Sequence, residues 1–165
     1  MQKIWNIAST GHINLARIKD FNEAEVRRKI RSRIAELQKD YLVLAYCGCA
    51  DGADMLFVRE VLDCGAGLVA VLPCTAEEFA LEHGDGGVEF MRVLAKAKKV
   101  LIVRDEKNRY VGVSRTMVQA CDELFAIWDG VELPLKDEEG NDINLGGTYD
   151  TILRAREAKK VITLL

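Results

Sequence analysis

Short apolar runs alternate with stretches of helical periodicity along most of the chain. In the apolar runs, residues on both faces of an extended backbone are hydrophobic, as in strands that helices cover on both sides. These runs are residues 4–9, 41–47, 68–72, 100–103, 124–128 and 161–165. The alternation predicts an α/β fold, with one domain over 1–165 built on a single Rossmann-like, doubly wound parallel sheet of about six strands with helices on both faces.

The segments between these runs carry the signals of helix starts. Asn22 can cap a helix, and Thr75 with Glu78 has the spacing of a capping box. The basic residues between 27 and 33 are interpreted as the solvated face of the first helix. The apolar face of that helix, at helical spacing, consists of Val26, Ile30, Ile34 and Leu37.

Polar and turn-forming residues follow the predicted strands at their carboxyl ends. In doubly wound folds ligands bind beyond these ends, where the strand order switches. The turns expected there are 9–12, 48–54, 104–110 and 129–148. The sequence therefore predicts a ligand site at this edge of the sheet.

The turn before the last predicted helix is the main candidate for binding a phosphate. Gly146, Gly147 and Thr148 open that helix, and glycines with a free helix N-terminus can hold an anion. The same residues can equally form an ordinary N-cap, with Thr148 capping toward Thr151.

Other residues at this edge have two interpretations each. His12 can be a hydrogen-bonded loop residue or a general base, and Asp129 can accept from ribose hydroxyls or form a turn with Gly130. The arginines can pair with phosphate oxygens or remain on the solvated surface. The full set of predicted ligand contacts is Ser9, Thr10, Gly11, His12, Gly48, Arg104, Arg109, Arg115, Asp129, Gly130, Gly146, Gly147 and Thr148.

Carboxylates at the same edge are the candidates for catalysis. Asp51 and Asp54 also have the alternative role of capping the second helix, and Trp128 is expected in the core. The sequence has no Walker A lysine motif, no G-x-G-x-x-G and no nucleophile elbow. The candidate catalytic carboxylates are Asp51, Asp54, Asp129 and Asp150.

Composition limits the classes of partner that the chain is expected to bind. A net charge of −3 over 165 residues disfavours nucleic acid. No apolar segment has signal or membrane length, so we expect a cytoplasmic protein without a membrane partner. The odd number of cysteines and the lack of C-x-x-C pairs favour buried thiols, although Cys47-Gly-Cys49 could begin a metal site; we expect neither metal nor cofactor. The acidic segment 131–145 is expected to form a surface arm.

Taken in order, several short motifs resemble the SLOG superfamily, which joins DNA-processing protein A to the LONELY GUY phosphoribohydrolases and to nucleotide-sensing domains of bacterial conflict systems. The resemblance spans almost the whole chain and implies a Rossmann-like sheet, a nucleotide-type ligand at the strand ends and a homodimer. The motifs are Ser9-Thr-Gly-His12, Gly48-Cys-Ala-Asp-Gly-Ala-Asp54, Val71-Leu-Pro73, Asp122-Glu-Leu-Phe-Ala-Ile-Trp-Asp-Gly130 and Gly146-Gly-Thr148.

The chain departs from the LONELY GUY pattern P-G-G-x-G-T-x-x-E at the catalytic position. Leu145 replaces the proline, and Thr151 stands where the resemblance places the catalytic Glu. Loss of that carboxylate argues against base-releasing hydrolysis. The resulting hypothesis is the binding or sensing of a nucleotide or nucleotide-derived signal, through an effector protein or by sequestration. The alternative is an N-glycosidic enzyme, a nucleoside-monophosphate phosphoribohydrolase or a catalyst similar to a deoxyribosyltransferase.

Overall fold

One parallel sheet organises the chain. The computed structural model describes residues 2–105, 109–132, 139 and 147–165. Its strands follow the order β4-β3-β2-β1-β5-β6, and every neighbouring pair is parallel. This confirms the predicted α/β fold. The strands are β1 (Lys3–Gly11), β2 (Tyr41–Cys47), β3 (Gly67–Leu72), β4 (Lys99–Ile102), β5 (Glu123–Ile127) and β6 (Val161–Leu164).

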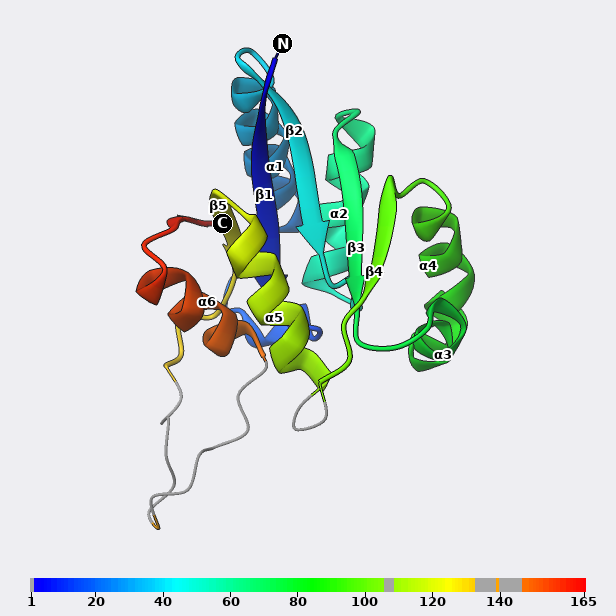
Figure 1. Cartoon of the computed structure of the whole chain (residues 1–165). Coiled ribbons are helices and arrows are strands. Elements are labelled where there is room, and N and C mark those ends of the chain that lie inside the picture. Colours follow the sequence, from blue (N-terminus) through cyan, green and yellow to red (C-terminus); the bar gives the residue numbers. More distant parts are fainter. Residues whose placement is uncertain (1, 106–108, 133–138, 140–146) are drawn as a thin grey trace.

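Helices cover both faces of this sheet (Figure 1). Side chains alternate across β1, so Ile7 belongs to the core beneath the first four helices and Ala8 to the core beneath the last two. The helices are α1 (Glu23–Leu37), α2 (Ala53–Asp63), α3 (Ala76–Glu82), α4 (Gly87–Leu94), α5 (Arg109–Ala120) and α6 (Thr148–Glu157), with short 3₁₀ turns η1 (Leu15–Arg17) and η2 (Gly84–Gly86). α1 and α2 lie on the far side of the sheet in Figure 1, and α5 and α6 on the near side.

The strand order reverses between β1 and β5. From β1 the chain moves outward through β2, β3 and β4, then returns to β5 on the other side of β1. The connections after β1 and β5 therefore separate toward opposite faces and leave a crevice at the carboxyl ends of these strands. The fold places the candidate site at this switch point.

Two predicted helix starts are present. Asn22 Oδ1 accepts a hydrogen bond from Glu25 N at 3.1 Å, and Thr75 with Glu78 forms a complete capping box. The predicted apolar face of α1 is the buried one: Val26, Ile30, Ile34 and Leu37.

Two local predictions were wrong. The segment expected to be a turn at 9–12 continues β1 as far as Gly11, because Gly11 pairs in register with Ile127 of β5. Neither Asp51 nor Asp54 caps α2, whose N-cap is Gly52 at φ +74° with no side-chain cap. The Asp54 carboxylate turns instead toward Ser9 and the backbone of Ala50.

The basic face of α1 is only partly a solvated surface. Arg27 and Arg31 pair with the buried carboxylate of Glu60, the latter at 2.7 Å from Nε to Oε2. Arg33 binds Glu123, which is also buried. These arginines therefore anchor α1 to α2 and β5.

No helix in the part of the chain that the structure describes is long and apolar enough to cross a membrane. Most of the predicted arm at 131–145 lies outside the described residues. Glu132 is described, and its carboxylate pairs with Arg156 of α6 at 3.0 Å.

Candidate functional site

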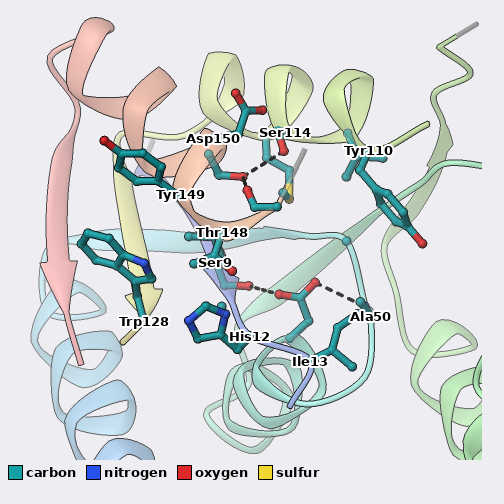
Figure 2. A pocket seen from close by; sticks show the side chains of 18 of the residues that line it. Ser9, His12, Ile13, Ala50, Tyr110, Ser114, Trp128, Thr148, Tyr149 and Asp150 are labelled. Carbon is teal, nitrogen blue, oxygen red and sulfur yellow. Dashed lines mark hydrogen bonds between the residues drawn. The ribbon is translucent and has the colours of Figure 1, made fainter. Parts of the chain in front are cut away.

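A cavity of about 560 Å³ opens at the switch point (Figure 2). Its walls come from the carboxyl ends of β1, β2, β3 and β5, from α5 and from the start of α6. This size lies in the range of small-molecule sites. The lining residues are Ser9, Thr10, Gly11, His12, Ile13, Asn14, Arg17, Gly48, Ala50, Asp54, Pro73, Tyr110, Val113, Ser114, Met117, Trp128, Val131, Gly147, Thr148, Tyr149, Asp150 and Thr151.

Ser9 and Asp54 form a buried polar pair in this wall. Ser9 Oγ donates to Asp54 Oδ1 at 3.4 Å and lies 3.2 Å from Cys47 Sγ, while Asp54 Oδ2 accepts from Ala50 N at 3.2 Å. Burial raises the pKa of Asp54 to about 6, against hydrogen bonds from Ala50 and Ser9 that lower it. The cavity thus contains a carboxyl group that can exchange a proton near neutral pH.

His12 and Arg17 lie on another wall and share one carboxylate. His12 Nε2 is 3.1 Å from Asp129 Oδ1, and Arg17 Nη2 donates to Asp129 Oδ2 at 3.3 Å. Asp129 Oδ1 also accepts from Val131 N at 3.0 Å and closes a turn over Gly130, at φ +79°. Asp129 therefore forms the expected turn and holds two side chains of the cavity wall.

The charges around Asp129 favour its ionised form. Burial raises the pKa of this carboxyl group, but the Val131 N–H and the neighbouring His12 and Arg17 outweigh burial. As a result its pKa lies below the ordinary value.

The first turn of α6 forms the wall that the glycine motif predicted. Gly147 is the N-cap, and no side chain among the described residues caps this helix, so Thr148 is not the cap that one interpretation expected. A Cβ added to Gly147 would meet no atom of the described residues within 4 Å, so none of these residues fills the space beside the helix N-terminus.

Hydroxyl groups occupy the position next to this turn. Thr151 Oγ1 donates to the carbonyl of Gly147 at 3.2 Å and lies 2.8 Å from Ser114 Oγ. Thr151 is buried, and Asp150 beside it pairs with Arg154 at 3.0 Å. The carboxylate of the LONELY GUY pattern is thus replaced by a hydroxyl that is already hydrogen-bonded.

Two stacked aromatic rings are among the residues that line the cavity. Trp128 and Tyr149 stack with 5.8 Å between ring centroids and 9° between planes, and the Arg156 guanidinium lies 6.0 Å from the Trp128 centroid. In Figure 2 both rings stand on the same side of the site, beside His12. Trp128, expected in the core, is only partly buried and lines the cavity.

Several predicted contacts lie away from the cavity. Arg109 pairs with Glu82 at 2.5 Å, Arg115 lies 3.9 Å from Asp105, and Asp51 contacts His83 at 2.6 Å. None of these, nor Arg104 or Gly130, is among the residues that line it. Gly146 lies outside the described residues. The structure does bring Ser9, Thr10, Gly11, His12, Gly48, Asp54, Gly147, Thr148 and Asp150 together at one site.

Sequence reasoning missed important lining residues. Arg17 lies in η1, well past the predicted turn, and no local motif distinguishes it from other surface arginines. Ser114 and Met117 lie on the inner face of α5, where periodicity indicated only a core.

The cysteines give no sign of a metal site. All five are free, and Cys47, Cys49 and Cys121 are buried. Burial raises the pKa of the Cys47 thiol well above its ordinary value, and Cys49 and Asp54 add to this shift. Within the described ranges, no cluster of His, Cys, Asp or Glu side chains could hold a metal ion.

Solved structures share the arrangement of this chain. DNA processing protein A from Streptococcus pneumoniae aligns over 98% of this chain and 50% of its own, with a TM-score of 0.61 and 12% identity. The molybdenum cofactor carrier protein from Chlamydomonas reinhardtii aligns over 99% of this chain and 76% of its own, at 0.55 and 14%. The chain therefore has the Rossmann-like fold that the resemblance to the SLOG superfamily implied.

The likeness extends to the fold and no further at these identities. DNA processing protein A from Helicobacter pylori, described for its single-stranded DNA binding mode, has the same Rossmann-like arrangement, with a TM-score of 0.56 and 10% identity over 97% of this chain and 64% of its own. This chain spans half the length of the Streptococcus pneumoniae protein. No protein-family model and no curated protein matches the sequence.

Proposed function

We propose that this chain binds a nucleotide or nucleotide-derived molecule in the cavity at the switch point and acts as a binding or sensing module. The observation that carries the proposal is the meeting, in one cavity, of a helix N-terminus without a side-chain cap and a stacked aromatic pair. The first suits a phosphate, and the second offers flat apolar surface to a base. Ser9 and Asp54 add groups that can hydrogen-bond a ribose.

The SLOG-type fold supports this position for a ligand but not a particular ligand. The titles of similar structures name single-stranded DNA for one protein and carriage of the molybdenum cofactor for another. For this chain, the net charge of −3 disfavours a long polyanion and favours a small ligand.

A thermal-shift screen against mono-, di- and cyclic nucleotides, NAD and ADP-ribose tests the proposal. We expect at least one of them to raise the melting temperature, because a ligand that binds only the native state stabilises it. Each mixture is then separated by chromatography, and recovery of the intact ligand supports binding without cleavage. No shift with any of these compounds would contradict the proposal.

Gly147→Asp gives a sharper test at the helix N-terminus. An N-cap aspartate should stabilise the unliganded protein by a few tenths to about 1 kcal/mol, because it accepts from the first-turn N–H groups. The same carboxylate would occupy and repel the place of a phosphate, so nucleotide binding should weaken by tenfold or more, on the order of one charged hydrogen bond. Calorimetric titration and urea unfolding measure the two effects.

Gly147→Asn is the matched control because its side chain has the same shape without the charge. It should stabilise the helix similarly and weaken nucleotide binding less than the aspartate does. If Gly147→Asp binds the nucleotide as tightly as the native sequence does, the phosphate does not lie at this end of the cavity.

The second candidate is an N-glycosidic enzyme, and the observation that favours it is the Asp54 carboxyl group in the cavity wall, with its pKa raised to about 6. Such a group can serve as a general acid or base near neutral pH. Release of free base and sugar phosphate in the chromatography, lost in Asp54→Asn, would support this candidate. Intact ligand would exclude it for the compounds in the screen.

A sensor also needs a component that responds to the bound state. We propose an effector protein or a second copy of this chain for that role, as the family resemblance suggests. Sedimentation velocity with and without the nucleotide that gives the largest thermal shift would detect a ligand-dependent dimer.

A further inference from the structure

Two segments far apart in the sequence meet at one carboxylate. His12 follows β1, Arg17 ends η1, and Asp129 follows β5; the Arg17 and Asp129 side chains are joined across 112 positions. Asp129 itself is not among the lining residues, whereas His12 and Arg17 are. The carboxylate therefore lies behind the wall and positions two side chains that can reach a ligand.

The geometry selects the proton arrangement on His12. Two contacts compete for Nε2: as a donor it faces Asp129 Oδ1 at 3.1 Å, and as an acceptor it faces Asp129 N at 3.3 Å. An unprotonated Nε2 would place its lone pair against an ionised carboxylate, so the donor arrangement is the favourable one. Among the described residues no side chain or backbone group is hydrogen-bonded to Nδ1. The neutral ring then presents an acceptor at Nδ1, and the protonated ring presents a donor there.

Arg17 adds a permanent positive charge beside this ring. Its side chain is 53% exposed and uses Nη2 for Asp129, which leaves other guanidinium N–H groups for a ligand. With His12 protonated, the two cations and Asp129 carry a net charge of +1. Among the described residues, the other charged groups on the cavity wall are Asp54 of α2 and Asp150 of α6, the latter paired with Arg154.

We infer that His12 and Arg17, both held by Asp129, form an oxyanion subsite that takes a phosphate group of the ligand, and that binding this group is coupled to protonation of His12. The inference rests on the proposed function and adds to it a second oxyanion position, apart from the one at the start of α6, and a proton. Asp129 is a positioning residue here: it holds the ring with Nε2 bonded and offsets the charge of the imidazolium.

The coupling has a defined sign. An oxyanion interacts favourably with an Nδ1–H donor and unfavourably with an Nδ1 lone pair. Affinity is therefore greatest where His12 is protonated and falls as pH rises through the imidazole range, by up to about tenfold per pH unit. By linkage, the oxyanion keeps His12 protonated to higher pH.

Sulfate is the probe, because its own charge does not change across the range of about pH 5 to 8 in which imidazole titrates. Imidazole resonances are followed by NMR while pH and sulfate are varied. The chain has two histidines, so His83 serves as the internal control. We expect sulfate to extend the protonated range of His12, to leave His83 unchanged, and to bind more weakly as pH rises.

Three variants separate the roles. In an Asp54→Asn background, which removes the other described group of the cavity wall that titrates near neutral pH, His12→Gln should make the sulfate affinity independent of pH over this range. Arg17→Met should weaken sulfate binding by about tenfold at every pH and keep the pH dependence, as expected for loss of a hydrogen bond from a charged donor. Asp129→Asn should weaken sulfate binding at every pH, because one amide oxygen cannot hold both His12 and Arg17 in place. Far-UV circular dichroism and unliganded melting temperatures establish that each variant is folded.

Sulfate binding that is pH-independent in the native sequence, or undetectable below the imidazole range, would overturn the inference. So would a His12→Gln variant that binds sulfate like the native sequence at every pH. The test of the proposed function is separate. If a nucleotide raises the melting temperature but sulfate binding does not depend on pH, the proposed function is supported and the oxyanion subsite is contradicted. If sulfate binding depends on pH as expected but no nucleotide raises the melting temperature, the oxyanion subsite is supported and the nucleotide proposal is contradicted.

Discussion

At the scale of single residues, Asp54 shows how position changes the chemistry of an ordinary side chain. Its carboxyl group is buried and accepts hydrogen bonds from Ser9 and Ala50, and no described cation is paired with it. Burial therefore dominates and raises the pKa to about 6 from 3.8. The same residue type at 129, surrounded by donors, has a lowered pKa.

Asp54→Asn should change the pH dependence of stability. Because the folded pKa exceeds the unfolded one, the native state binds more protons, and stability falls as pH rises from about 4 to about 6. The shift corresponds to at most about 3 kcal/mol, since one side of the group faces the open cavity. Urea unfolding from pH 4 to 7 should show this loss in the native sequence and not in the variant.

Asp20→Asn, at an exposed turn, is the control for removing one negative charge. If the free energies of unfolding of the native sequence and Asp54→Asn differ by the same amount at pH 4 and pH 7, Asp54 does not titrate in this range.

At the scale of elements, α1 is attached to the sheet by charge as well as by its apolar face. Glu123 at the start of β5 is fully buried, and Arg33 binds it with Nε 3.0 Å from Oε1 and Nη2 2.9 Å from Oε2. Thr163 of β6 donates to the same carboxylate at 2.6 Å. One buried acid thus joins α1, β5 and β6.

Arg33→Met should destabilise the protein by about 3–5 kcal/mol, because it leaves the Glu123 carboxylate buried and uncompensated. Urea unfolding at pH 7 measures this loss. The double variant Arg33→Met, Glu123→Met should recover most of it, since a pair of apolar side chains needs no compensating charge.

Arg28→Met on the exposed side of the same helix is the matched control and should stay within about 0.5 kcal/mol of the native sequence. A single variant at Arg33 that is no less stable than this control would show that the Glu123 charge is solvated or protonated.

At the scale of the whole molecule, the switch point requires three elements to meet closely. Gly11 ends β1 where β5 and α2 approach, and a Cβ there would lie 2.3 Å from the Ala53 Cβ and 2.8 Å from the Ile127 carbonyl oxygen. Gly52 opens α2 beside it at a positive φ that favours glycine. Gly11 also lines the cavity, so the close packing at this point borders the candidate site.

Gly11→Ala should destabilise the protein by about 1–3 kcal/mol or more, because backbone and Cβ atoms cannot rotate away from the added methyl group. Gly86→Ala is the matched control: its added Cβ would have neighbours at 3.6 and 3.7 Å, and its φ of −74° suits alanine. The control should be neutral or slightly stabilising. Equal melting temperatures for the two variants would contradict the tight packing at Gly11.

The sequence by itself determined the elements and the edge of the sheet that carries the site. Strand runs, the Asn22 cap and the Thr75 capping box depend on neighbours a few residues away, and the structure contains them. Residues at the carboxyl ends of parallel strands must meet at one edge, so the grouping of Ser9, His12, Gly48 and Gly147 could be predicted from their order in the chain.

Only the tertiary structure decided which charges face the cavity. Arg109 and Arg115 turn to acids near them, whereas Arg17, in a segment without a motif, reaches Asp129. Thr151 contacts Ser114 of another helix. The Asp54 carboxylate accepts hydrogen bonds from Ser9 and Ala50 instead of capping α2. The partner of a long side chain depends on distance and burial. Both are set by packing between elements far apart in the sequence, and local periodicity does not encode that packing.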